Sequence, residues 1–228
     1  MVYYTGDIHG QPYKIEGFCK KHNLTEDDVI VILGDVGANY FGDERDSRLK
    51  KIFAKLPPTI FCIHGNHERR PSTLPGYIKT EWRGGSVWMQ KKYPRLLFAE
   101  DGAVFDLDGL QTIIIGGAYS VDKYFRLARG ISWFPDEQPS DEIKAKVESV
   151  LEERAWKIDQ VLSHTCPEKY TPTEAFLPTI NQALVDRSTE SWLDSIEDKL
   201  TYSRWLCGHW HIDKHIDNLH FLMDGFET

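Results

Sequence analysis

Five short motifs of the chain carry side chains of the kinds that bind metal ions. In chain order they are Gly6-Asp7-Ile8-His9-Gly10, Gly34-Asp35, Gly65-Asn66-His67-Glu68, His164 and Gly208-His209-Trp210-His211. They offer imidazole nitrogens, carboxylate oxygens and an amide oxygen but no thiolate, and this mixture suits Mn, Fe or Zn rather than Ca. Alone, a Gly-Asp pair is most often a turn, and a single His after a strand is most often structural. Together, the motifs predict a metal site.

The spacing within the first and last motifs indicates that neighbouring side chains share an ion. Asp7 and His9 are two positions apart, so on an extended segment both project to the same side and can hold one ion. His209 and His211 have the same spacing. Each pair therefore predicts part of a ligand set.

The middle motifs complete a site for two ions. Asp35 has two carboxylate oxygens and can bridge both ions, and Asn66 offers a neutral carbonyl oxygen. His67 is offset from Asn66 by one position, so we expect its side chain to point elsewhere. Two ions about 3.5–4 Å apart can clamp a phosphoryl group and generate a hydroxide at neutral pH.

Each motif directly follows a short run that is typical of a β-strand. We expect these strands at residues 2–5, 29–33, 59–63, 160–163 and 204–207. The run from Val29 to Leu33 is continuously apolar, which predicts a strand buried on both faces. Ligands bind at the carboxyl ends of strands in α/β sheets, so these strands should place the metal-binding side chains along one rim.

The remaining elements are predicted from apolar pattern and capping residues. Further strands are expected at 86–89, 96–99, 103–107 and 111–115, a β-hairpin at 214–226, and helices at 13–22, 44–55, 141–156 and 179–200. Ser140 is the expected N-cap of the third helix, with two acidic residues in its first turn. Residues 119–140 show no clear period, which predicts a long irregular loop or a small cap.

In this order, the motifs resemble those of the calcineurin-like metallophosphoesterase superfamily, and the resemblance covers residues 6–211. It implies an α/β fold: a four-layer α-β-β-α sandwich of two mixed β-sheets flanked by helices. It also implies a role for each matched residue. Asp7, His9 and His211 would bind the first ion, Asn66, His164 and His209 the second, Asp35 would bridge both, and His67 would stay off the metals.

The implied reaction is hydrolysis of phosphomonoesters or phosphodiesters by a hydroxide that bridges the two ions. The resemblance makes His67 a proton donor to the leaving oxygen or a phosphate contact. An unperturbed imidazole titrates near neutrality, which suits proton transfer. A carboxylate that would orient His67 is not obvious, because residues 34–39 contain no acidic residue except Asp35.

The second motif departs from that of the protein Ser/Thr phosphatases in this superfamily. Those have G-D-x-V-D-R-G, whereas this chain has G-D-V-G-A-N over residues 34–39 and lacks the Asp-Arg pair. A phosphate-binding arginine must then come from elsewhere, since an arginine can hold phosphate oxygens in bidentate fashion. The candidates are Arg69, Arg70, Arg126 and Arg129, each of which could instead be a solvated surface residue.

Composition limits the class of protein and its compartment. The chain has 228 residues, which fits one domain over 1–228 with an insertion around 119–140. A formal net charge of -8 argues against an extended face for duplex nucleic acid.

Cys62 and Cys207 lie in apolar runs, and no C-x-x-C pair occurs, so we expect buried free thiols and no zinc-cysteine site. The first motif begins too early for a signal peptide and no run is long enough to span a membrane, so we expect a cytoplasmic protein.

Several substrates and one non-catalytic role remain open. The expected partner is a phosphorylated small molecule, a nucleotide or a phosphoprotein. Alternatives to a general phosphoesterase are a nuclease or cyclic-nucleotide phosphodiesterase, a protein Ser/Thr phosphatase, and a non-catalytic metal-binding scaffold. Aromatic residues near Arg126 could stack on a base or simply cover the core; they are Tyr119, Tyr124, Phe125, Trp133 and Phe134.

Overall fold

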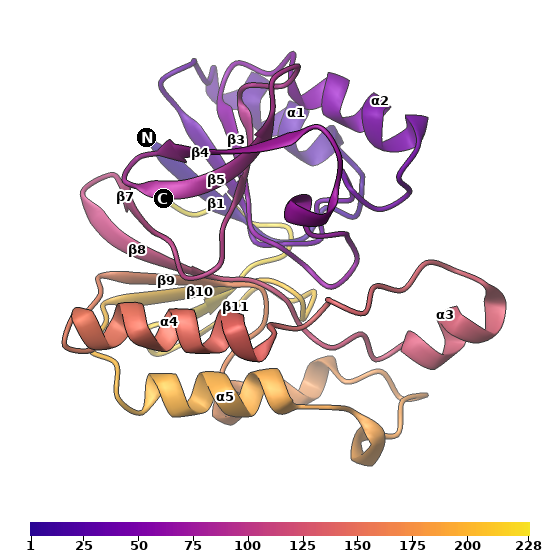
Figure 1. The fold of residues 1–228 in the computed structure, drawn as a ribbon, viewed down its shortest axis with the longest axis vertical. Coiled ribbons are helices and arrows are strands. Elements are labelled where there is room, and N and C mark those ends of the chain that lie inside the picture. Colours follow the sequence, from indigo (N-terminus) through magenta and orange to yellow (C-terminus); the bar gives the residue numbers. More distant parts are fainter.

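A computed structural model describes all residues, 1–228, as two facing β-sheets with helices outside both (Figure 1). In spatial order, the first sheet contains β1 (Val2–Thr5), β2 (Val29–Ile32), β3 (Thr59–Cys62), β6 (Leu96–Ala99), β5 (Gly85–Gln90) and β4 (Tyr77–Trp82). The second contains β11 (Lys214–Ile216), β12 (Leu219–Phe221), β10 (Arg204–Cys207), β9 (Gln160–Ser163), β8 (Leu110–Ile115) and β7 (Val104–Leu107).

Helices cover the outer face of each sheet. The first sheet is covered by α1 (Tyr13–His22) and α2 (Glu44–Phe53), and the second by α4 (Asp141–Glu153) and α5 (Ser188–Glu197) (Figure 1). The short helix α3 (Lys123–Arg129) extends beyond both sheets. Each sheet has parallel and antiparallel pairs. The predicted four-layer α-β-β-α sandwich of two mixed sheets is confirmed.

Strand β2 shows how one apolar run serves two cores. Val29 and Val31 pack in the core between the sheets, whereas Ile30 and Ile32 pack in the core under α1 and α2. Because side chains of a strand alternate between its two faces, a strand buried on both faces must be apolar at every position. The prediction from the continuous run is confirmed.

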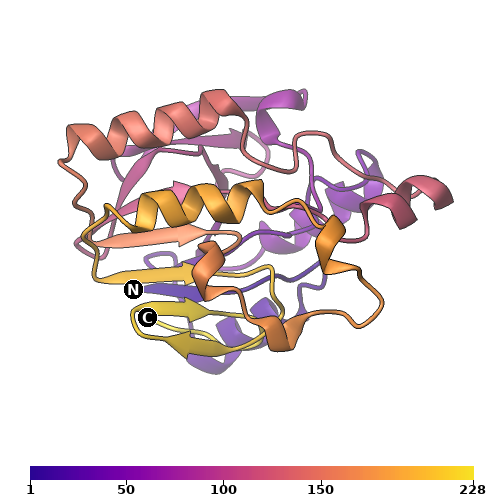
Figure 2. The ribbon, with the colours of Figure 1, turned by 90° about the horizontal axis from the view of Figure 1, so that it is seen from below.

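The strands that precede the motifs end at the same end of the molecule. In the first sheet β1, β2 and β3 are parallel neighbours, and in the second β9 and β10 are a parallel pair. The arrows of β9 and β10 point toward the end of the molecule where α3 lies (Figure 2). The carboxyl ends of these five strands therefore lie close together, and the loops that follow them share one region of the molecule.

The helix predicted at 179–200 is wrong in its first half. Helix α5 begins only at Ser188, and residues 182–184 form an isolated 3-10 turn (Gln182–Leu184). The side chain of Asn181 accepts a hydrogen bond from the backbone N–H of Ala183, 3.1 Å away, and Asp186 accepts one from Ser188, 2.9 Å away. Such side-chain bonds offer the backbone an alternative to a helix.

Other differences are smaller. Helix α4 has its predicted N-cap, Ser140, but ends at Glu153, because Ala155 and Trp156 have φ values of 52° and 56° that a right-handed helix does not allow. Strand β4 was not predicted, since it lies at the sheet edge and has no apolar run. The C-terminal hairpin is confirmed only for residues 214–221, where β11 pairs with β12.

Two predictions about cysteines and membrane spans can be compared with the structure. All four cysteines are buried and unpaired, as expected for Cys62 and Cys207, and none belongs to a cluster that could hold a metal ion. None of the helices has the length and apolar character required to cross a bilayer.

Candidate metal centre and pocket

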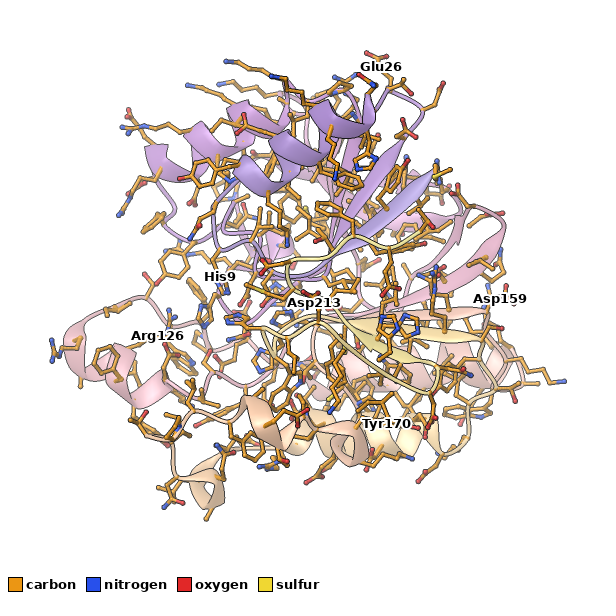
Figure 3. The ribbon with its side chains drawn as sticks, turned by 180° about the vertical axis from the view of Figure 1, so that it is seen from behind. His9, Glu26, Arg126, Asp159, Tyr170 and Asp213 are labelled. Carbon is orange, nitrogen blue, oxygen red and sulfur yellow. The ribbon has the colours of Figure 1, made fainter.

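The five motifs meet where the carboxyl ends of the two sheets adjoin. Asp7, after β1, accepts a hydrogen bond on Oδ1 from the backbone N–H of His209, after β10, over 3.0 Å. His164, after β9, lies 2.7 Å from the backbone oxygen of Leu33, after β2. Figure 3 shows His9 in the region between the two halves of the molecule. These contacts join the sheets at the metal-binding motifs.

Asp7, His9 and His211 form the first group of candidate ligands. The Nε2 atoms of His9 and His211 are 2.9 Å apart, and Oδ2 of Asp7 lies 3.7 Å and 3.3 Å from them. That carboxylate oxygen is buried and has no hydrogen-bond partner. Two facing imidazole nitrogens and an unpartnered carboxylate oxygen fit a shared cation, and Zn and similar ions take these ligands at about 2.0–2.2 Å.

Asn66, His164 and His209 form the second group. Oδ1 of Asn66 lies 2.8 Å from Nε2 of His164 and 3.0 Å from Nδ1 of His209. The carbonyl of Leu33 can only accept, so Nδ1 of His164 donates to it, and Nε2 faces the amide oxygen of Asn66. An imidazole nitrogen and an amide oxygen this close together fit two ligands of one cation. Metal-binding imidazoles commonly donate their other N–H to a backbone carbonyl.

Asp35 lies between the two groups. Its Oδ1 is 3.7 Å from Nε2 of His164, and its Oδ2 is 3.9 Å from Nδ1 of His9. Oδ1 also accepts the backbone N–H of His67 over 2.7 Å. One oxygen therefore faces each group, which is the arrangement that a bridging carboxylate needs.

The backbone at the site differs from the extended conformation expected for the i, i+2 pairs. His9, Asp35, His209 and His211 have φ values of 44°, 48°, 64° and 51°. The left-handed region is rare for residues other than glycine, and such strain persists where surrounding structure imposes it, often at functional sites. The side chains converge because the chain turns at each ligand.

Electrostatics follow from burial and close packing of these groups. Burial alone would raise the pKa of Asp7, but neighbouring His164, His211 and His9 outweigh it and hold the carboxyl pKa well below its usual range. Burial lowers the pKa of His209 well below the ordinary imidazole value, and His164 adds to the shift. The Asp7 carboxylate raises the pKa of His211. The buried site thus favours the neutral form of His209, whereas the charged Asp7 carboxylate favours the protonated form of His211.

Glu68, which received no role in the sequence analysis, ties two of the motif loops together. Its Oε1 accepts backbone N–H groups of Val36, 3.4 Å away, and Gly65, 3.2 Å away. Burial, with Asp35 nearby, raises the pKa of Glu68 to about 8. Ser120, also unforeseen, has its Oγ 2.8 Å from Nδ2 of Asn66 and so directs the amide oxygen toward the histidines.

His67 lies at the edge of the metal centre, against α3. Nη2 of Arg126 lies 2.9 Å from its Nδ1 and 3.1 Å from its Nε2. Oδ2 of Asp35 is 4.0 Å from Nδ1, and Oδ1 of Asp122 is 3.9 Å from Nε2. Burial lowers the pKa of His67; the carboxylate of Asp35 opposes this shift and the guanidinium of Arg126 reinforces it. Neither carboxylate hydrogen-bonds the ring at these distances; Asp122, outside the second motif, instead pairs with Arg126, which contacts the ring.

The structure brings one of the four candidate arginines to His67. Arg126 is buried, pairs with Asp122 over 2.7 Å, and reaches the site from α3, whose position beside the metal centre is seen in Figure 3. Arg70 instead pairs with Asp101. Arg69 lies 5.9 Å from the ring centroid of Phe134, and Arg129 is exposed.

A pocket of about 450 Å³ opens beside the metal centre. Its far wall comes from residues 175–190 and Trp210, none of which the sequence singled out as substrate contacts. Of the aromatic residues considered for base stacking, Tyr119 lines the pocket, whereas Tyr124 and Phe125 are exposed on α3. Trp133 donates to Glu137, and Phe134 packs on Tyr40, so neither faces the pocket.

Comparisons with known proteins agree with this geometry. The sequence pattern of the family described as "Calcineurin-like phosphoesterase" matches residues 1–213. A 69-residue stretch is 35% identical to the catalytic subunit of serine/threonine-protein phosphatase 6 of Drosophila melanogaster; it covers 30% of this chain and only 23% of that protein. The crystal structure of TT1561 of Thermus thermophilus has a TM-score of 0.53 at 12% identity, covering 97% of this chain and 87% of that one. At this identity the likeness shows the fold alone.

We predict that Gly65→Ala disrupts the metal centre. A Cβ at Gly65 would overlap Oδ1 and the backbone nitrogen of Asp35, and neither can move without displacing a ligand. Overpacking of this kind typically costs about 1–3 kcal/mol. Chemical denaturation and elemental analysis should show lower stability and less bound metal. Gly17→Ala in α1 is the control, since a Cβ there meets nothing and should stabilise the helix by roughly 0.5–1 kcal/mol. Equal metal content in both variants would contradict the close approach at Gly65.

Proposed function

Because the chain belongs to the calcineurin-like phosphoesterase family, we propose that it is a phosphoester hydrolase that uses two metal ions. The observation that carries this proposal is the position of Asp35 between two groups of candidate ligands. The first ion would be held by Asp7, His9 and His211, and the second by Asn66, His164 and His209. Bound there, metal ions would supply Lewis acidity toward phosphoryl oxygens and a nucleophile at neutral pH.

His67 is the proposed proton-transfer residue. Its ring centroid lies 5.3 Å from that of His9, and it lines the pocket where a leaving group must lie. His67 also forms, with His9 and Asp35, a third group of side chains that could hold a metal ion. We propose that His67 nevertheless binds neither ion. Arg126 contacts the ring from the side of α3 and is itself fixed by Asp122.

Arg126 is the proposed phosphate contact that replaces the missing Asp-Arg pair. Its guanidinium is fixed by Asp122, by the hydroxyl of Tyr40 at 3.0 Å and by the backbone oxygen of Ser132 at 3.1 Å. Nη2 is left to face His67. A guanidinium held in this way can bind a phosphoryl oxygen with little loss of side-chain entropy. In this proposal the phosphate-binding guanidinium comes from α3 instead of from the loop after β2.

Turnover of para-nitrophenyl phosphate and bis-para-nitrophenyl phosphate with added Mn tests the proposal. We expect hydrolysis of at least one, lost on chelation and restored by metal. The pair also separates monoesterase from diesterase activity. Absence of turnover on either, together with absence of bound metal by elemental analysis, would leave a non-catalytic fold and overturn the proposal.

Two substitutions separate the role of His67 from that of Asp35. His67→Ala should retain both metals yet lose activity by roughly 10²–10⁴-fold, the usual contribution of a general acid. Asp35→Asn should instead lower the affinity of both metal positions, because the bridging charge is gone. Elemental analysis measures the bound metal in each variant, and kcat measures its activity. Metal loss in His67→Ala would mean that His67 is a ligand.

Arg126→Lys should weaken substrate binding while the metals stay in place. A lysine keeps the charge but loses the planar fork, so we expect kcat/KM to fall roughly tenfold or more, as for loss of a charge-assisted hydrogen bond. Arg129→Lys on the same helix is the matched control, because Arg129 is exposed. Equal kcat/KM values in the two variants would remove Arg126 from the substrate site.

A further inference from the structure

The pocket has a second half that the proposed chemistry does not use. Beyond the metal centre, its wall includes the rings of Phe176 and Trp210, whose centroids lie 6.1 Å apart at an interplanar angle of 36°. The indole N–H of Trp210 donates to Oγ1 of Thr165 over 3.2 Å, which fixes the ring. Aromatic faces of this kind are platforms on which planar rings stack.

Glu190 supplies a buried polar group in the same half of the pocket. Glu190 is only 5% exposed to solvent, yet it lines the pocket. Oε1 accepts the hydroxyl of Thr165 over 2.8 Å, whereas Oε2 is buried and has no partner. A buried acceptor without a donor is unfavourable, so a ligand that donates a hydrogen bond to this oxygen would be stabilised. Burial also raises the pKa of Glu190, as expected for a carboxyl that lacks such a donor.

Trp210 and Glu190 are joined through Thr165. The Thr165 hydroxyl accepts from the indole and donates to the carboxylate, so the stacking face and the unpartnered oxygen are held in one fixed relation. Thr165 directly follows His164, one of the candidate metal ligands. A ligand bound at this wall therefore lies next to the metal centre, where its phosphate would react.

We propose that this half of the pocket binds the base of a nucleotide substrate, with the ring stacked on Trp210 or Phe176 and an N–H or amino group donating to Oε2 of Glu190. A nucleobase combines a planar face with edge donors, which is the chemistry that the two observations require together. The cavity of about 450 Å³ is within the range for small ligands and suits a mononucleotide. This inference rests on the proposed phosphoesterase function, whose substrate class it names.

The test compares substrates that differ only in the base. The metal-loaded protein is assayed with nucleoside 5′-monophosphates and with ribose 5-phosphate, which has the sugar and phosphate but no base. We expect kcat/KM for at least one nucleotide to exceed that for ribose 5-phosphate by roughly tenfold or more, because only the nucleotides have a base that can stack on the aromatic rings. Equal values for all substrates would overturn the base site and leave the phosphoesterase proposal intact.

Glu190→Gln provides the specific variant. The carboxamide replaces one acceptor by a donor, so kcat/KM for the preferred nucleotide should fall roughly tenfold while that for ribose 5-phosphate stays unchanged. Glu153→Gln, at an exposed position of α4, is the matched control. A uniform loss on every substrate would show a structural role and overturn the proposal, and denaturation curves of both variants check folding.

A binding measurement separates failure of this inference from failure of the proposed function. Calorimetry with the four nucleosides, which carry no phosphate, reports on the base site without turnover. If no phosphoester is hydrolysed, the proposed function fails, but nucleoside binding that is lost in Glu190→Gln still supports the base site. Absence of nucleoside binding to the wild-type protein, with no preference for nucleotides in turnover, refutes it.

Discussion

The buried carboxylate of Asp7 is the group on which the meeting of the two sheets depends. A charged carboxylate taken out of water costs several kcal/mol unless donors or cations surround it. Here one oxygen accepts a backbone N–H from the opposite sheet, at His209, and the other faces His9 and His211. Because these partners come from both sheets, the carboxyl ends of β1 and β10 are held together, and the loops that follow them must turn tightly enough to converge.

Much of the metal centre was predictable because its signals are local. Each candidate ligand directly follows a strand, and parallel strands bring their carboxyl ends to one edge, so chain order and an apolar run such as that of β2 are sufficient to group the side chains. The two mixed sheets follow from the same pattern. What the spacing did not show is the left-handed backbone at His9, Asp35, His209 and His211, which depends on contacts between loops.

The pocket beside the candidate metal centre could not be predicted in the same way, because its contacts are distant in sequence and have no period. Arg126 reaches His67 across 59 residues, and Thr165 reaches Glu190 across 25. Residues 179–187 were expected to begin a helix, but local side-chain bonds at Asn181 and Asp186 hold them in an irregular wall of the pocket. Only the folded chain shows that Arg126 contacts His67 and that Glu190 lines the cavity.

The contact between Asp7 and His209 also determines when the site can exist. The two residues are 202 positions apart, so the first motif leaves the ribosome long before its partner is synthesised. Until β10 has emerged, Asp7 and His9 have no second sheet against which to form a metal site, and the nascent chain holds only fragments of it. Pairing over such separations is slow, because the entropy of closing the loop is lost before the contact stabilises the fold. A metal ion can therefore bind to the complete set of candidate ligands only late in folding, after both sheets have formed.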